Sequence, residues 1–211
     1  MKYFVSCKIN AAFPEQDAKL IAYLQDHGNI GTVGCCREKE QLALQESALV
    51  ICHTCASILE ESGRANSVAY VWEYIDKDPD FVFPDYHGEE IALQDCYMSR
   101  ERTSVQEAVR SLLRKMNFKV VELEHNREQA DLCGLRTQEP LKANQELASK
   151  HFCEPGAITP LEAEARKAYL TEYVKQYKTA RVVTYCGACR MAMKQGGANV
   201  VHLLELLFPT K

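Results

Sequence analysis

Cysteine recurs in the same order twice along this chain of 211 residues, and that repeat limits what the chain can fold into. The first half has a lone cysteine, an adjacent pair and a C-x-x-C, which are Cys7, Cys35-Cys36 and Cys52-His53-Thr54-Cys55. The second half has a lone cysteine, a single central cysteine and a C-x-x-C, which are Cys96, Cys133 and Cys186-Gly187-Ala188-Cys189. An internal repeat defines the structural unit, so we expect two related halves with one group of thiols each.

The composition and charge of the chain indicate the environment in which these thiols work. With 46% hydrophobic and 26% charged residues, the chain has the profile of an ordinary globular protein. Its net charge of -4 argues against a nucleic-acid or anionic-membrane surface. No apolar run approaches the roughly 18 residues of a membrane span, and the first residues do not form a secretion signal. We therefore expect a cytoplasmic protein, in which clustered cysteines stay reduced and bind metal or carry redox chemistry.

The adjacent pair Cys35-Cys36 argues against a disulfide scaffold. Neighbouring Cα atoms lie about 3.8 Å apart, whereas disulfides usually need at least about 4.4 Å. Two adjacent sulfurs can, however, point at one polynuclear metal centre. Buried inert cysteines are the other alternative.

The pattern of apolar residues predicts strands and helices in alternation, and hence an α/β fold of two pseudo-symmetric halves with short, mainly parallel sheets. Strands are expected at residues 2–7, 48–51, 90–93, 119–123, 181–185 and 199–203. Helices are expected at 14–25, 38–47, 56–61, 67–75, 104–116 and 159–178. The last of these begins with a capping box at Thr159 and a proline at the first helical position.

Proline, aspartate and glycine concentrate between Asp76 and Glu89, which predicts the boundary there. The first cysteine-rich half is then 1–80 and the second is 81–211, with an inserted helical segment around 138–178 that contains Cys153. The cysteines that follow predicted strands lie at the sheet edge where ligands collect, and these are Cys7, Cys52, Cys96 and Cys186. Each C-x-x-C also begins a helix, whose N-terminus favours the metal-binding thiolate.

Several segments together resemble the cysteine-rich CCG-domain family, typified by the disulfide-cleaving subunit of heterodisulfide reductase and the iron–sulfur subunits of glycolate and lactate oxidases. The segments are Tyr3-Phe4-Val5-Ser6-Cys7, Gly34-Cys35-Cys36, Cys52-His53-Thr54-Cys55, Gln94-Asp95-Cys96, Cys133-Gly134 and Tyr185-Cys186-Gly187-Ala188-Cys189. The resemblance covers nearly the whole chain. It departs at Arg37, which replaces the glycine of the first C-C-G, and at Leu132, which replaces the first cysteine of the second.

The resemblance implies an iron–sulfur redox subunit that relays electrons or reduces a disulfide. It implies a first ligand set of Cys7, Cys35, Cys36, Cys52 and Cys55 for a 4Fe–4S cluster of non-cubane type. It implies a second set of only four thiolates, Cys96, Cys133, Cys186 and Cys189, which suit an iron–sulfur cluster or tetrahedral zinc. Cys153 is a candidate fifth ligand there, the alternative being an ordinary thiol beside a turn.

Two other functions stay open at this point: a zinc-binding structural module and a metal-free dithiol oxidoreductase. The chain has neither a dinucleotide-binding glycine motif nor a ferredoxin-like cysteine run, so electrons must come from a flavoprotein or ferredoxin-like partner. We interpret His53 as an outward-facing spacer, and Arg37 and Arg190 as cations beside an anionic centre or as solvated surface residues. The tyrosines spaced by four residues are interpreted as packing residues, namely Tyr169, Tyr173 and Tyr177.

Overall fold

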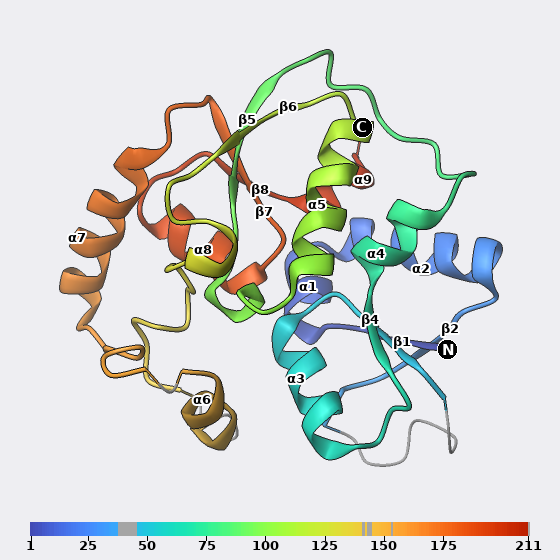
Figure 1. Ribbon diagram of the computed structural model, residues 1–211, viewed down its shortest axis with the longest axis horizontal. Helices are drawn as coiled ribbons and strands as arrows, with labels where there is room; N and C mark the ends of the chain where they lie inside the picture. Colours follow the sequence, from blue (N-terminus) through green and yellow to red (C-terminus); the bar gives the residue numbers. More distant parts are fainter. Residues whose placement is uncertain (38–45, 141, 143–144, 153, 211) are drawn as a thin grey trace. The chain divides into compact units, whose positions relative to one another are not determined.

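The computed structural model describes residues 1–37, 46–140, 142, 145–152 and 154–210 (Figure 1). The chain divides into two compact units. Unit 1 is Met1–Pro84 with Leu204–Lys211, and unit 2 is Asp85–Leu203. Each unit contains a four-stranded parallel sheet, which confirms the predicted α/β halves with short parallel sheets.

Unit 1 alternates strands and helices from the first residues on (Figure 1). Its elements are β1 (Lys2–Phe4), α1 (Cys7–Ala12), α2 (Pro14–Gly28), β2 (Gly31–Val33), β3 (Ala48–Val50), α3 (His53–Ser62), β4 (Val68–Tyr70) and α4 (Val71–Lys77). The C-terminal helix α9 (Leu203–Leu207) leads into the last residues of this unit. The expected helix 38–47 falls for the most part outside the described residues.

Unit 2 repeats this alternation with a longer connection before its third strand. Its elements are β5 (Glu90–Gln94), η1 (Tyr97–Ser99), α5 (Thr103–Lys115), β6 (Lys119–Glu122), η2 (Arg127–Gln129), α6 (Gln145–His151), α7 (Ala163–Tyr173), η4 (Val174–Gln176), β7 (Arg181–Thr184), α8 (Gly187–Gln195) and β8 (Val200–His202). The helices α6 and α7 lie in the predicted insertion. No helix in the described part of the chain is long and apolar enough to cross a membrane.

The two sheets have equivalent strand orders, β2-β1-β3-β4 and β6-β5-β7-β8. In each unit the second strand pairs on one side of the first strand, and the third and fourth strands are added on its other side. Ligands of open α/β sheets bind beyond the carboxyl ends of the strands where this order reverses. Because the first three strands of each unit are neighbours, the segments that follow them meet at one edge of the sheet.

Two predicted elements are wrong. The segment 67–75 is not one helix, because Val68, Ala69 and Tyr70 pair in parallel with β3 before the chain turns helical at Val71. Valine and tyrosine favour strands, and this preference holds where a neighbouring strand is available. The helix expected from Thr159 begins at Ala163, because the Thr159 hydroxyl donates to the Gly156 carbonyl instead of capping a helix.

The cysteines of unit 2 are part of its hydrophobic core. Cys96, Cys133 and Cys189 are buried in one cluster with side chains from β5, β7 and α8. In unit 1, α3 packs against β3 and β4, and α2 packs against β2. Two cysteines of unit 1, Cys36 and Cys55, are buried as well.

Candidate metal site

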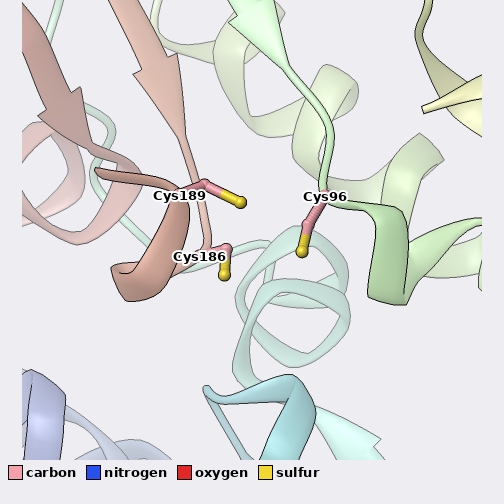
Figure 2. Close-up of side chains that lie close together, drawn as sticks. All are labelled: Cys96, Cys186 and Cys189. Atoms are coloured by element: carbon pink, nitrogen blue, oxygen red, sulfur yellow. The ribbon is translucent and has the colours of Figure 1, made fainter. Parts of the chain in front are cut away.

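Three thiols converge at the carboxyl edge of the sheet of unit 2. The Sγ atoms of Cys96, Cys186 and Cys189 all lie within 4.8 Å of one another (Figure 2). Cys96 follows β5, and the other two cysteines flank the start of α8, which follows β7. Because β5 and β7 are hydrogen-bonded parallel neighbours, the segments that follow them leave the sheet side by side.

Cys133 adds a fourth sulfur to this group. Its thiolate accepts hydrogen bonds from the thiols of Cys189 and Cys96, which lower the pKa of Cys133 to about 5. The thiols that donate are held protonated: burial raises the pKa of Cys96, and the bond to Cys133 raises that of Cys189. Within the group, these hydrogen bonds favour the thiolate at Cys133 and the protonated thiol at Cys96 and Cys189.

The Leu132 backbone ties the segment of Cys133 to the other two. Its carbonyl accepts from the Tyr97 N–H at 2.9 Å and lies 3.7 Å from the Cys189 thiol. The Leu132 side chain is buried in the core. The backbone of Leu132 thus contacts both Tyr97 and Cys189 while its side chain packs among apolar residues.

Gly134 lets the loop after Cys133 approach the beginning of α8. A Cβ atom added at Gly134 would lie 1.9 Å from the Ala188 carbonyl oxygen and 2.4 Å from its carbon. Only glycine fits against a backbone at this distance. The pair Cys133-Gly134 is therefore explained by geometry, because the close approach brings the central cysteine next to Cys189.

Four thiols of unit 1 are joined in the corresponding place. Cys36 is hydrogen-bonded to Cys55 and Cys35, and Cys55 also to Cys52. The bond from Cys55 lowers the pKa of Cys36 to about 7, with burial opposing it, while the same bond raises the pKa of Cys55. Cys52 is the N-cap residue of α3, as Cys186 is of α8. The prediction that each C-x-x-C begins a helix is correct.

Two predicted ligands differ from the rest. Cys7 is the first residue of α1 and its side chain is exposed, whereas the other described cysteines are buried or half-buried. Cys153 lies outside the described residues. All nine described cysteines carry free thiols. Sulfur contacts therefore join eight of the ten predicted positions into two groups, one in each unit.

His53 does not face outward as the sequence suggested. Its side chain is only 4% exposed, and its Nδ1 lies 2.9 Å from the Tyr70 hydroxyl. The cause is local: α3 packs on β3 and β4, and Tyr70 ends β4. The histidine inside the first C-x-x-C therefore packs into unit 1, behind the thiols.

Two of the three tyrosines at four-residue spacing make polar contacts with the segments that carry the cysteines. The Tyr173 hydroxyl donates to Asp131 at 2.7 Å, and the Tyr177 hydroxyl donates to Gln94 at 2.7 Å. Asp131 precedes Cys133 by two residues and Gln94 precedes Cys96 by two. The insertion of unit 2 is therefore hydrogen-bonded to the segments that carry two of the four thiols.

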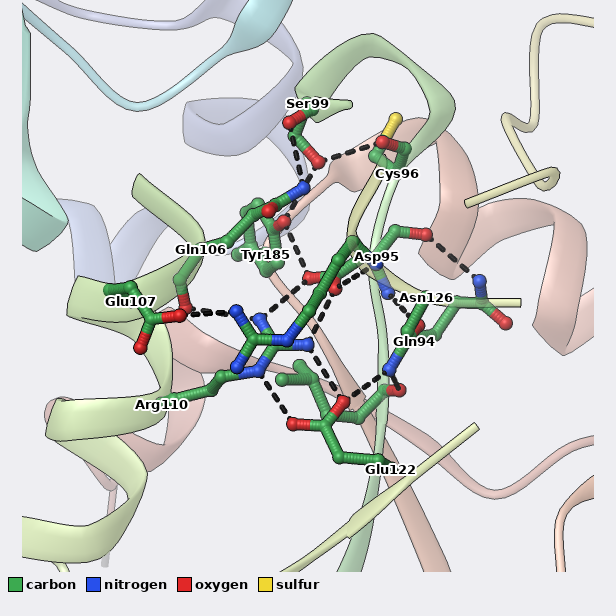
Figure 3. A network of polar contacts seen from close by, with 12 residues as sticks. Gln94, Asp95, Cys96, Ser99, Gln106, Glu107, Arg110, Glu122, Asn126 and Tyr185 are labelled. Atoms are coloured by element: carbon green, nitrogen blue, oxygen red, sulfur yellow. Dashed lines mark hydrogen bonds and ion pairs between the residues drawn. The ribbon is translucent and has the colours of Figure 1, made fainter. Parts of the chain in front are cut away.

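A buried polar network beside Cys96 was not predicted from the sequence (Figure 3). Arg110, on α5, donates to Asp95 at 2.7 Å and to Glu122 at 2.5 and 2.7 Å. Burial lowers the pKa of Arg110, but the two carboxylates outweigh it and raise that pKa. Burial likewise raises the pKa of Glu122, and Arg110 reverses this and lowers it. The sequence contains one sign of this network: polar residues, Asp95 and Tyr185, directly precede Cys96 and Cys186.

The donor set of unit 2 fits a thiophilic metal. Three of its sulfurs lie within 4.8 Å of one another, and the fourth, that of Cys133, is hydrogen-bonded to those of Cys96 and Cys189, which favours the thiolate at Cys133. A bound cation would deprotonate the remaining thiols and neutralise the buried charge. Four thiolates can ligate tetrahedral zinc or an iron–sulfur cluster. The chemistry of the donors therefore supports a metal site without specifying the metal.

Comparisons with known proteins do not assign a family. No family model and no curated protein matches the chain. Among solved structures, it is similar to the crystal structure of an aspartate racemase homologue from Pyrococcus horikoshii OT3, with 10% identity and a TM-score of 0.34 over 98% of this chain and 95% of that one. A similarity at this level carries no argument about fold or function.

Proposed function

We propose that the chain is an iron–sulfur cluster-binding redox subunit of the heterodisulfide reductase type. The observation that carries the proposal is the pair of thiol groups at corresponding edges of two sheets with equivalent strand orders. A scaffold role would need neither two such groups nor the adjacent thiols Cys35 and Cys36 in the first of them.

The ligands follow from the contacts and from the resemblance of the sequence. Unit 2 would hold its centre with Cys96, Cys133, Cys186 and Cys189, and unit 1 with Cys35, Cys36, Cys52, Cys55 and the exposed Cys7. A bound cluster would supply one-electron transfer. The chain itself contributes the thiolates, a core that buries three of the four unit 2 cysteines, and an open side at Cys7 in unit 1.

The reaction class that fits two electron carriers is reduction of a disulfide. The S–S bond is broken by two electrons, and two protons complete the two product thiols. The electrons would come from a flavoprotein or ferredoxin-like partner, because the sequence has no nicotinamide, flavin or ferredoxin motif of its own. A small disulfide is the substrate class, and the cytoplasm is the proposed compartment.

Two specific observations support the competing functions. The compact group of four sulfurs in unit 2 would also suit a structural zinc ion. The lowered pKa of Cys36, beside Cys55, would suit metal-free dithiol exchange in unit 1. Neither accounts for both groups at once, so the iron–sulfur function is preferred.

Purification without oxygen, followed by iron, sulfide and zinc analysis and visible spectroscopy, tests the proposal. We expect brown protein with iron and labile sulfide. Replacing Cys36 by Ser should change the signal of unit 1, and Cys133→Ser that of unit 2. Cys153→Ser is the matched control and should leave both unchanged. Colourless protein with stoichiometric zinc would exclude the redox function, and colourless protein without metal would favour dithiol exchange.

A further inference from the structure

The carboxylate of Asp95 lies at the centre of the polar network in unit 2 and is completely buried. It accepts hydrogen bonds from the Arg110 guanidinium at 2.7 Å and from the Tyr185 hydroxyl at 2.7 Å. It also accepts from the backbone N–H of Arg127 at 2.9 Å. Asp95 thus has the donors that a buried charge needs, supplied by α5, by the end of β7 and by the loop after β6.

The network reaches the backbone of Cys96 and the side chain of Tyr185, the residue before Cys186 (Figure 3). Asp95 directly precedes Cys96 and Tyr185 directly precedes Cys186. Ser99 closes a small ring, because its hydroxyl donates to the Cys96 carbonyl at 2.7 Å and lies 2.8 Å from the Tyr185 hydroxyl. A single carboxylate therefore joins the two strand ends from which the sulfur atoms project.

The fold itself does not require this connection. Unit 1 has an equivalent strand order, yet Ser6 and Ile51 occupy the positions directly before Cys7 and Cys52. Its own buried carboxylate, Asp17, accepts from Tyr3 and Asn10 and so joins β1, α1 and α2. The side chain of Ile51 is apolar and offers no bond of the kind that Tyr185 makes. Among the described residues, a carboxylate that joins the two cysteine-bearing strand ends is thus found in unit 2.

We propose that Asp95, held by Arg110 and Tyr185, is a positioning residue that fixes Cys96 and Cys186 in the ligating arrangement before a metal binds. This inference rests on the proposed function only in that the thiols of unit 2 bind a metal. Its consequence is that the metal affinity depends on side chains that never touch the metal, because the free protein keeps the sulfur atoms together. Such neighbours typically account for a factor of about 10–100 in affinity.

Cobalt(II) titration of reduced, metal-free protein tests this inference, since thiolate-to-cobalt charge-transfer bands report the number of sulfur ligands and the d–d bands report their geometry. The parent protein carries serine at Cys35, Cys36 and Cys55, so that a complete thiol group remains only in unit 2. Tyr185→Phe removes the hydroxyl between the two strand ends and leaves the ring. We expect it to weaken cobalt binding by about 10- to 100-fold and to shift the d–d bands.

The matched control is Glu89→Gln. Glu89 pairs with Arg181 at 2.6 and 2.7 Å, also in unit 2 but at the start of β7 rather than its end. Glu89→Gln should leave the cobalt affinity within about twofold of that of the parent protein, since the bond between Glu89 and Arg181 does not reach the cysteine segments. If Tyr185→Phe fails to fold by circular dichroism, Ser99→Ala takes its place, because it removes the bond to the Cys96 carbonyl and the contact with the Tyr185 hydroxyl but leaves Tyr185 and Asp95 in place.

The outcomes separate the two proposals. Unchanged affinity and bands in Tyr185→Phe, or an equal loss in Glu89→Gln, would overturn the positioning role while leaving the metal site standing. Absence of charge-transfer bands in the parent protein would overturn the metal site itself, and the positioning role with it. A selective loss in the variants beside the cysteines supports the inference.

Discussion

Replacing Arg110 by Met should destabilise unit 2 strongly. Arg110 is 1% exposed, and its partners differ: Asp95 is completely buried, whereas Glu122 is 43% exposed. Without the guanidinium, Glu122 can regain water, but Asp95 stays buried as an uncompensated charge. Breaking a buried pair in this way costs about 3–5 kcal/mol. A domain of this size is typically stable by about 5–15 kcal/mol, so the loss would be a large share of the total.

The assay must report on unit 2 alone. The single tryptophan, Trp72, belongs to unit 1, so tryptophan fluorescence follows the wrong unit. Cys96 is completely buried, and its alkylation in increasing urea, measured by mass spectrometry on reduced protein, gives the free energy of opening unit 2. Arg181→Met is the control, because its pair with Glu89 is 25% and 35% exposed and should contribute about 0–1 kcal/mol.

A second substitution checks the stated cause. If the loss comes from an unpaired buried charge, adding Asp95→Asn to Arg110→Met should restore part of the stability, because the charge is then gone. The reasoning is refuted if Arg110→Met costs less than about 1 kcal/mol, which an exposed pair would give. It is also refuted if the double variant loses the sum of both single losses, since the two residues would then act independently.

Three further changes have defined outcomes. Gly134→Ala places a Cβ against the Ala188 carbonyl, and we expect a loss of about 1–3 kcal/mol and weaker cobalt binding, measured by urea titration and absorbance. Tyr173→Phe removes a bond between α7 and the loop before the central cysteine, and hydrogen exchange in α7 should reveal a loss of about 1–2 kcal/mol. The Tyr23 hydroxyl bond lowers the pKa of Asp78, so its contribution is complete above about pH 4 and disappears as the pH falls through the folded-state value. Asp78→Asn should therefore flatten the acid side of the stability curve.

The sequence predicts the ends of β1, β3, β5 and β7 well because each of these strands belongs to a short apolar run that a cysteine closely follows. The runs ending at Ile51 and Tyr185 are examples, and in both the next residue caps a helix. Parallel strands place their carboxyl ends at one edge, so the strand order brings the segments that carry the cysteines to that edge, although Cys7 stays outside the thiol group of unit 1. The order itself comes from the repeat, because both halves place their cysteines after the corresponding strands.

The network around Asp95 could not be predicted in the same way. Arg110 lies on the amphipathic helix α5, and nothing in its local sequence distinguishes it from the solvated charged residues of the same helix. Its burial depends on a carboxylate on β6 and another after β5, and no local pattern records that pairing. The segment 67–75 failed for a related reason, because its first residues are strand only through pairing with β3. Long-range partners decide such cases, and a single sequence does not show them.

Differences in exposure between the two thiol groups separate their proposed roles. In unit 1, Cys7 is exposed and Cys35 and Cys52 are half-buried, whereas in unit 2 only Cys186, among the described cysteines, is even half-buried. A disulfide substrate must touch the centre that cleaves it, so the open group of unit 1 suits the reaction. A core that excludes water suits a centre that only stores or passes electrons, since it prevents contact with solvent and substrate. The hydrogen-bonded network around Asp95 suits this electron-storing role of unit 2. A centre that exchanges no ligand binds its metal more tightly when the thiols are held in one arrangement.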